Sequence, residues 1–184
     1  MRKKLKIPPI VYFVIAFGLL YLGTRLQPID SLQGQILVAT EKLENDSNFT
    51  NGVILLLEDR KAQAVGLVLN GAAYGHPKVE GARWGGPVDS DVVHYLSHKK
   101  SKGAHKIPNT DLYVVFGRDI DPDSPPENAV KFYGGAGWDE RQLNREMKRG
   151  MWNAVPALDA KTLLTMPQEG MYETFLERAE SKED

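Results

Sequence analysis

The sequence predicts one globular domain of strands followed by helices, preceded by a single N-terminal membrane helix. Two observations predict this. An uncharged apolar run covers residues 7–23, directly after a basic segment. Beyond it, strand-like apolar segments fill residues 34–133, and amphipathic helical patterns begin only after residue 137. We therefore expect residues 1–30 to form a basic segment, an anchor and a linker, and residues 31–184 to form the folded domain.

The composition agrees with one ordinary globular domain. Of 184 residues, 42% are hydrophobic and 26% are charged, which is close to average usage. The chain has no cysteine, which excludes disulfides, thiolate metal sites and cysteine nucleophiles.

The charges are distributed unevenly between the two predicted parts. The first 25 residues hold five of the 23 basic side chains and no acidic one. The remaining residues therefore carry 18 basic and all 24 acidic side chains, a formal charge of −6. Because binding to nucleic acid depends mainly on lysine and arginine contacts to phosphate, this acidic domain argues against a nucleic-acid partner.

The apolar run at residues 7–23 is at the lower edge of the length that crosses a hydrocarbon core of about 30 Å. Tyr12 and Tyr21 lie near its ends, where aromatic rings favour the membrane interface. The alternatives are a cleaved signal peptide and a buried core helix. Bulky residues at 20–22, where cleavage requires small ones, favour an uncleaved signal anchor that binds membrane lipid. The basic flank predicts a cytoplasmic N-terminus, with the domain on the periplasmic or lumenal side.

Strands are predicted by short apolar runs between polar turns. The turn at residues 59–61 joins two of these runs into a hairpin, and their continuous apolar character predicts burial on both faces. Residues 98–106 and 119–128 are expected to be polar loops. The predicted strands are residues 34–40, 52–58, 64–70, 111–117 and 129–133.

Helices are predicted only in the last third of the chain. Asp139 is a candidate N-cap, with Gln142 completing a capping box and Trp138 preceding the cap as part of a hydrophobic staple. Gly150 can end this helix in a left-handed conformation. A final amphipathic helix is expected over residues 167–179.

An ordered series of short segments runs along the domain and carries a family resemblance. The series consists of residues 34–39, 48–49, 53–56, 66–70, Gly85-Gly86-Pro87-Val88, Gly135-Ala136-Gly137-Trp138, Gln142-Leu143 and Trp152. In this order it resembles the YqgE/AlgH family of bacterial proteins over residues 32–180.

The resemblance implies an α+β fold, in which a strongly bent sheet curls into a partial barrel with helices outside. It implies no agreed activity, and family members are often named as transcriptional regulators. This chain departs from the family pattern at Gly71-Ala72, where the family has Arg-Pro, and at Gly134-Gly135, where it has Gly-Tyr. It also carries Asp139 in place of a glycine, and an added N-terminal anchor.

Two spacings suggest metal ligands, but both lack the rest of a site. His94 and His98 are four residues apart, without the glutamate of a zinc-protease motif. Asp119, Asp121 and Asp123 alternate as in a calcium loop, but the positions that need glycine and glutamate hold serine and valine. We expect a surface histidine pair and a solvated loop, with no metal or cofactor.

Two glycine-rich segments mark the most promising place for a pocket. Residues 134–137 precede the predicted helix start, where backbone N–H groups can bind an anion. The alternative is that these glycines, and those at 85–86, allow close chain approach or a bulge. The candidate pocket or interaction residues are Asn70, Gly85, Gly86, Pro87, Gly137, Trp138 and Gln142.

Arg141, Arg145 and Arg149 follow one another at helical spacing and form a possible basic docking stripe. Such a stripe is most often a solvated face, and it can also dock an acidic partner.

The leading hypothesis is a non-enzymatic, membrane-anchored accessory or interaction domain, as a subunit or regulator of a membrane protein complex. No GxSxG motif, Ser-Lys pair or paired carboxylate motif occurs in the sequence. The alternative is a transcriptional or ligand-binding regulator, as the family is often named. A hydrolase with an unfamiliar site is the third possibility.

Overall fold

In the computed structural model, described residues are 31–60, 63–77, 80–121, 126–139 and 141–181. They belong to one compact unit, residues 32–184, in which nine described strands form a single sheet. The strands are β1 (Gln35–Ala39), β2 (Val53–Arg60), β3 (Gln63–Val68), β4 (Arg83–Trp84), β5 (Val88–Ser97), β6 (His105–Lys106), β7 (Tyr113–Val115), β8 (Val130–Asp139) and β9 (Trp152–Pro156).

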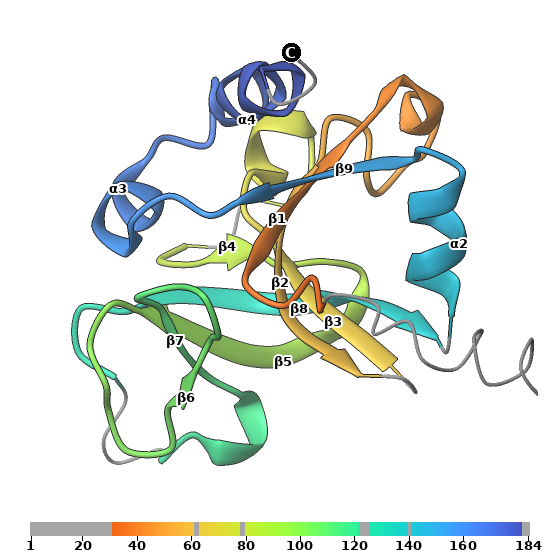
Figure 1. Ribbon diagram of the computed structural model, residues 1–184. Coiled ribbons are helices and arrows are strands. Elements are labelled where there is room, and N and C mark those ends of the chain that lie inside the picture. The colour runs from red at the N-terminus through yellow and green to blue at the C-terminus, as the bar shows by residue number, and fades with distance from the viewer. Residues whose placement is uncertain (1–30, 61–62, 78–79, 122–125, 140, 182–184) are drawn as a thin grey trace, which may run out of the picture. The chain divides into compact units, whose positions relative to one another are not determined.

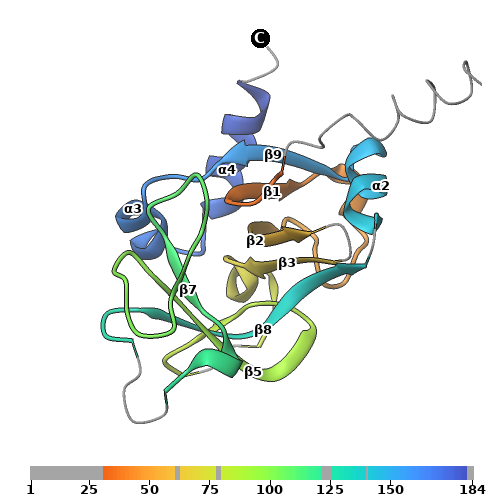
Figure 2. The same ribbon diagram turned by 60° about the horizontal axis from the view of Figure 1, so that its bottom comes forward.

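The sheet curls into a half-barrel in the order β6-β7-β5-β8-β3-β2-β1-β9 (Figures 1 and 2). All neighbours along this order are antiparallel, and the short β4 adds a parallel pairing to β8. This confirms the curled sheet that the family resemblance implied.

The central strands are buried on both faces, as their continuous apolar sequence predicted. Along β2, Val53, Leu55 and Leu57 belong to one core cluster, whereas Ile54 and Leu56 belong to a second cluster. Successive side chains of a strand point to opposite faces, so two cores must cover the two sides of this hairpin.

Helices cover the sheet on both of these sides. The α-helices are α2 (Gln142–Lys148), α3 (Ala160–Thr165) and α4 (Met171–Glu180), and the 3-10 helices are η1 (Glu41–Leu43), η2 (Gly71–Tyr74) and η3 (Gly117–Asp119). Met171 and Phe175 of α4 enter the first core, and Leu143 of α2 enters the second. The helices α2 and α3 lie at opposite ends of β9 in both views (Figures 1 and 2).

The helix start predicted at Asp139 is wrong. The strand β8 continues through Asp139, and α2 begins only at Gln142, after Arg141 in a left-handed conformation with φ 67°. Half of the predicted capping box is present, because the Gln142 side chain accepts the backbone N–H of Asp139 at 3.2 Å.

The end of α2 was predicted correctly. Gly150 has φ +65°. The N–H of Gly150 bonds to the carbonyl of Met147, and the N–H of Met151 bonds to that of Glu146. This paired arrangement is the left-handed termination that glycine favours.

Several element boundaries differ from the sequence prediction. The predicted turn at 59–61 begins inside β2, which runs to Arg60, and β6 interrupts the predicted loop at 98–106. The last helix begins at Met171 rather than at residue 167, because Gly170 adopts φ +77° before it. The strands β4, β5 and β9 and the helix α3 were not predicted.

No described helix is long and apolar enough to cross a membrane. The predicted anchor, residues 7–23, lies outside the residues that the structure describes.

Candidate functional site

A cavity of about 280 Å³ opens on the face of the sheet that carries the first core cluster. Val65 of β3, which lines it, shares its face with Leu67 of that cluster, two residues along the strand. The lining residues are Glu58, Gln63, Val65, Val88, Asp89, Val92, His94, Phe116, Gly117, Arg118, Gly135, Ala136 and Gly137. They come from β2, β3, β5, β8 and the segment at the start of η3.

The cavity exists because two features leave this part of the sheet unfilled. Gly135 and Gly137 of β8 supply no side chain to it. A Cβ atom at Gly137 would lie 3.5 Å from the Val88 side chain, an ordinary contact, so space rather than crowding surrounds this glycine.

The second feature is an irregularity in β5, which we call the β5 arch, residues 89–92. Pairing of β5 with β8 stops at Val88 opposite Gly135 and resumes at Val93 opposite Tyr133. The four arch residues therefore stand opposite Gly134 alone, so the strand must bulge. The arch begins with Asp89 at φ 49°, a left-handed conformation that aspartate tolerates better than most residues.

His94 is the titratable group on the inner wall of the cavity. Its Nδ1 atom is buried and has no hydrogen-bond partner among the residues that the structure describes. Its ring packs edge-on to Phe116, with ring centroids 5.8 Å apart. Burial lowers the pKa of His94 below its usual value, the charge of Asp89 opposes this, and the charge of Arg118 lowers the pKa further. The imidazole is therefore neutral near pH 7.

Charged side chains of both signs line the same cavity as this histidine. Glu58 and Asp89 are acidic, Arg118 is basic, and all three line the cavity. The guanidinium of Arg118 lies 5.3 Å from the centroid of the Phe116 ring, and its Nε is 3.6 Å from Asp119. Among the described residues that line the cavity, none is a serine, threonine, tyrosine or lysine, and the groups that could react are the carboxylates of Glu58 and Asp89 and the imidazole of His94.

Of the pocket residues predicted from sequence, Gly137 alone lines this cavity among the described residues. Asn70 has a structural position instead. It is fully buried, its Oδ1 accepts the N–H of Val53 at 2.9 Å, and its Nδ2 donates to the carbonyl of Asn51 at 2.9 Å. The side chain thereby fastens the end of the β3 segment to the start of β2.

Gly85 and Gly86 also have a packing position, as the alternative interpretation proposed. A Cβ atom at Gly85 would collide with the carbonyl oxygen of Gly134, and one at Gly86 would overlap the backbone of Gly135. The two glycine segments thus pass each other at backbone contact distance. Pro87 is exposed and leads into β5.

The possible anion site at residues 134–137 depended on a helix that begins directly after them. These residues lie inside β8 and do not precede a helix, because the strand continues to Asp139. Gly135 pairs with β5, and Ala136 and Gly137 pair with β3.

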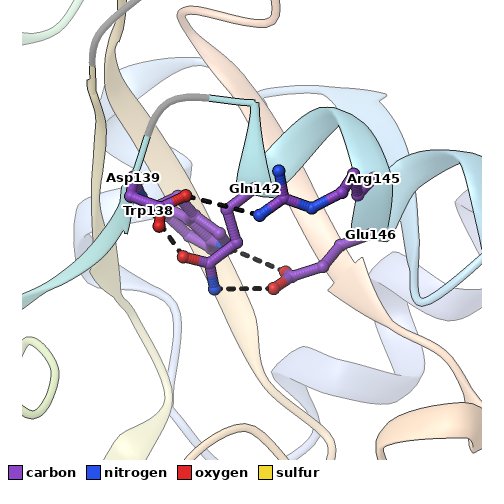
Figure 3. A network of polar contacts seen from close by, with 5 residues as sticks. All are labelled: Trp138, Asp139, Gln142, Arg145 and Glu146. Carbon is purple, nitrogen blue, oxygen red and sulfur yellow. Dashed lines mark hydrogen bonds and ion pairs between the residues drawn. The ribbon is translucent and has the colours of Figure 1, made fainter.

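Trp138 and Gln142 belong to a polar network around Glu146 (Figure 3). Glu146 Oε2 accepts the indole N–H of Trp138 at 2.8 Å, and its Oε1 accepts the amide of Gln142 at 2.8 Å. The indole of Trp152 donates to the same Oε2 at 2.8 Å. Phe49 packs against both indoles, stacked on Trp138 and edge-on to Trp152. This network joins α2 to β8 and β9.

The predicted basic stripe is exposed but is not a single helical face. Arg145 lies within α2, whereas Arg141 precedes it in a left-handed conformation and Arg149 caps its end. Arg145 lies 3.5 Å from the carboxylate of Asp139 (Figure 3). Docking of an acidic partner here stays a prediction.

The two suggested metal spacings do not converge. His94 lies in β5 and His98 follows the strand, which is not the helical geometry that brings such a pair together. Asp119 pairs with His105 at 3.1 Å and Asp121 with Lys102 at 2.9 Å, and Asp123 lies outside the described residues. Within the described part of the chain, no group of three or more potential ligands gathers.

Sequence reasoning missed the cavity residues Glu58, Asp89, Arg118 and Val65. They come from strands and turns that are distant in sequence and meet only when the sheet curls. One signal was available, namely glycine at alternate positions 135 and 137, which leaves one face of a strand without side chains.

Comparison with known proteins identifies relatives over nearly the whole described unit. The AlgH-like family model (DUF179) matches residues 36–183. A UPF0301 protein from Parabacteroides distasonis is 29% identical over 168 residues, covering 79% of this chain and 82% of the relative. A UPF0301 protein from Streptomyces avermitilis is 31% identical over 153 residues, covering 69% of this chain and 76% of the relative.

Two solved structures share the fold. The solution structure of the AlgH protein from Pseudomonas aeruginosa aligns with a TM-score of 0.62 and 22% identity, covering 83% of this chain and 90% of that one. A crystal structure of a Corynebacterium diphtheriae protein aligns with a TM-score of 0.61 and 21% identity, covering 85% of this chain and 92% of that one. At these identities the likeness concerns the fold alone.

Proposed function

The chain belongs to the AlgH-like family, and we propose that it acts as a non-enzymatic interaction domain, an accessory subunit or regulator of a membrane protein complex. Residues 7–23 would hold it in the membrane, with the N-terminus in the cytoplasm and the domain on the far side. The apolar run and its basic flank support this placement.

The observation that carries the proposal is the apolar rim of the cavity. Val88, 44% exposed, is the exposed large hydrophobic residue of the described chain. It stands in the exposed segment 87–91, directly over the cavity. Single exposed apolar side chains are common on protein surfaces, so the support for a protein contact is the position of Val88 in the lining of a cavity bordered by exposed charged residues. The ionisable groups nearby can orient a partner by charge.

Cross-linking in intact cells tests this function. The full-length wild-type chain, Val88→Asp and the control Glu169→Ala, which changes an exposed residue before α4, would be purified from membranes in mild detergent. We expect wild type and control to retain one specific protein complex and Val88→Asp to lose most of it. A wild-type chain that migrates alone, or a complex that Val88→Asp leaves intact, would contradict the proposal.

A second candidate function is a regulator that binds a small ligand, and the cavity itself favours it. Its volume of about 280 Å³ lies near the lower end of the range of roughly 300–1,000 Å³ typical of ligand pockets. The version of this function that acts on DNA is opposed by the formal charge of −6 beyond residue 25. If the protein bound DNA with micromolar or tighter affinity, and if that affinity fell steeply with salt, a DNA-binding regulator would again be supported.

A further inference from the structure

We propose that the cavity between β3, β5 and β8 binds a small zwitterion with an apolar side chain, that is, a free α-amino acid. The inference rests on the second of the two functions above, binding of a small ligand, and names the class of that ligand.

The wall of the cavity fits an apolar side chain. Hydrocarbon surface comes from Val65, Val92 and Phe116. On the β8 side, Gly135 and Gly137 have no side chains, so the backbone itself lines the cavity there. Burying an aliphatic side chain against such surfaces is favourable by about 25 cal/mol for each Å² removed from water. The volume suits a single small molecule better than a nucleotide.

The charges fit the two ends of an amino acid. The guanidinium of Arg118 meets Asp119 through Nε, at 3.6 Å, and carries further N–H donors for a carboxylate. Its stacking over Phe116 places it beside the apolar wall. Asp89, at the start of the β5 arch, is the exposed anionic group that would receive an ammonium group.

His94 adds a neutral polar group between these charges. Asp89 and Arg118 both act on the charge of His94, so each of them lies within electrostatic reach of the histidine. His94 lines the cavity, whereas its Nδ1 atom is shielded from solvent and so makes no direct contact with a ligand there.

Ligands with only one of these charges match the lining less well. A fatty acid would place a carboxylate near Arg118 but leave its hydrocarbon beside Asp89 and Glu58. A simple amine would meet the charge of Asp89 but would offer no carboxylate to Arg118. A molecule with both groups on one carbon satisfies both signs at once.

Calorimetric titration of the full-length chain in mild detergent tests the proposal. The probes are L-leucine, L-valine and L-phenylalanine, with L-leucinamide and N-acetyl-L-leucine as forms that lack one charge. We expect saturable binding of at least one amino acid. Its amide and N-acetyl forms should bind about tenfold more weakly or worse, as loss of a charge-assisted hydrogen bond predicts.

Three variants link the binding to this cavity. Gly137→Val fills the floor from a position where a Cβ atom makes an ordinary 3.5 Å contact, and should abolish binding. Arg118→Gln should remove the preference for leucine over leucinamide, which lacks the carboxylate. Asp89→Asn should remove the preference for leucine over N-acetyl-leucine, which lacks the ammonium group. Asp91→Asn, an exposed change that does not touch the cavity, is the matched control.

The outcomes separate this inference from the interaction function. If no amino acid gives saturable heat up to millimolar concentration, or if Arg118→Gln leaves the preference for leucine intact, the amino-acid assignment is wrong. Capture of a membrane complex that still depends on Val88 would then leave the interaction function standing. Should Gly137→Val fail to fold, the exposed charge variants Arg118→Gln and Asp89→Asn decide the question.

Discussion

The indole Nε1–H of Trp152 donates a hydrogen bond to Glu146 Oε2, with 2.8 Å between the nitrogen and the oxygen. This bond links the last strand, β9, to α2. The same oxygen receives the indole of Trp138 from β8. One carboxylate therefore satisfies two buried indoles that lie at separate places in the sheet. Helix α2 is short, with seven residues, so this contact rather than helical propensity holds it in place.

Replacing Glu146 by alanine should destabilise the fold by about 2–5 kcal/mol, because two buried indole N–H groups lose their acceptor. The two tryptophans are only 3% and 2% exposed, so water cannot replace the carboxylate without opening the core. Glu146→Gln keeps one acceptor oxygen and should cost less. Urea unfolding followed by tryptophan fluorescence measures both. The exposed control Glu169→Ala should change the free energy of unfolding by less than about 0.5 kcal/mol. If Glu146→Ala changed it as little as this control does, the explanation would be refuted.

Glycine substitutions should separate backbone crowding from cavity space. Gly86→Ala should cost about 3 kcal/mol or more, because its Cβ would overlap the backbone of Gly135 and its φ is +145°. Gly75→Ala should cost only about 1–2 kcal/mol, because it has φ +86° but nothing within 4 Å. Gly137→Ala should be nearly neutral. Thermal unfolding of the three variants should follow this order, and a neutral Gly86→Ala would show that the two glycine segments are not in contact.

Asn70 should tolerate neither alanine nor aspartate. Alanine would leave the N–H of Val53 and the carbonyl of Asn51 unpaired in the interior, at a cost of about 2–4 kcal/mol. Aspartate keeps the acceptor for Val53 but loses the donor and brings a charge to a fully buried position. Denaturant unfolding at pH 7 should find Asn70→Asp at least as unstable as Asn70→Ala. The destabilisation by Asn70→Asp should become smaller in acid, where the carboxylate is protonated. A fold unaffected by either change would mean that water pairs these groups.

His94 should make the fold less stable as the pH falls below about 6.5. Its pKa is lowered in the folded protein, chiefly by burial, so below its usual value of 6.5 the unfolded chain binds the proton more readily. The free energy of unfolding therefore decreases as the pH falls from 6.5 toward the folded pKa. His94→Gln should remove this part of the pH dependence, measured by unfolding at several pH values. If the difference in unfolding free energy between the wild type and His94→Gln stayed constant with pH, this prediction would be contradicted.

The same histidine reports on its charged neighbours. Arg118→Gln should raise the pKa of His94, since the arginine charge lowers it, and Asp89→Asn should lower the pKa. Imidazole titration by NMR measures both directions, with Asp91→Asn as the control. Asparagine at position 89 keeps the left-handed conformation accessible, so the change in charge is not confounded by the backbone.

The sequence was informative wherever a local rule decided the structure. The apolar runs of β1, β2 and β3 predicted strands buried on both faces, because no other conformation buries such short runs so fully. Gly150 predicted a helix end, because the left-handed termination depends on that residue itself.

It was misleading where tertiary pairing overrode the local pattern. Residues 134–139 carry three glycines, a tryptophan and an aspartate, which is typical of a loop before a helix, yet pairing with β3 keeps them extended. The segment of β9 contains asparagine and proline and is strand only because β1 offers it a partner. The cavity depends on the β5 arch and on the curl of the sheet, and no local pattern encodes either.

The pairing of β1 with β9 also sets a requirement on synthesis. The first strand made is flanked by β2, which follows it closely, and by β9, whose residues 152–156 leave the ribosome last among the strands. Until then the nascent chain carries β1 as an open edge, a surface that can pair with another chain. The interval between translation of residues 39 and 152 is therefore the period in which this protein most depends on chaperones.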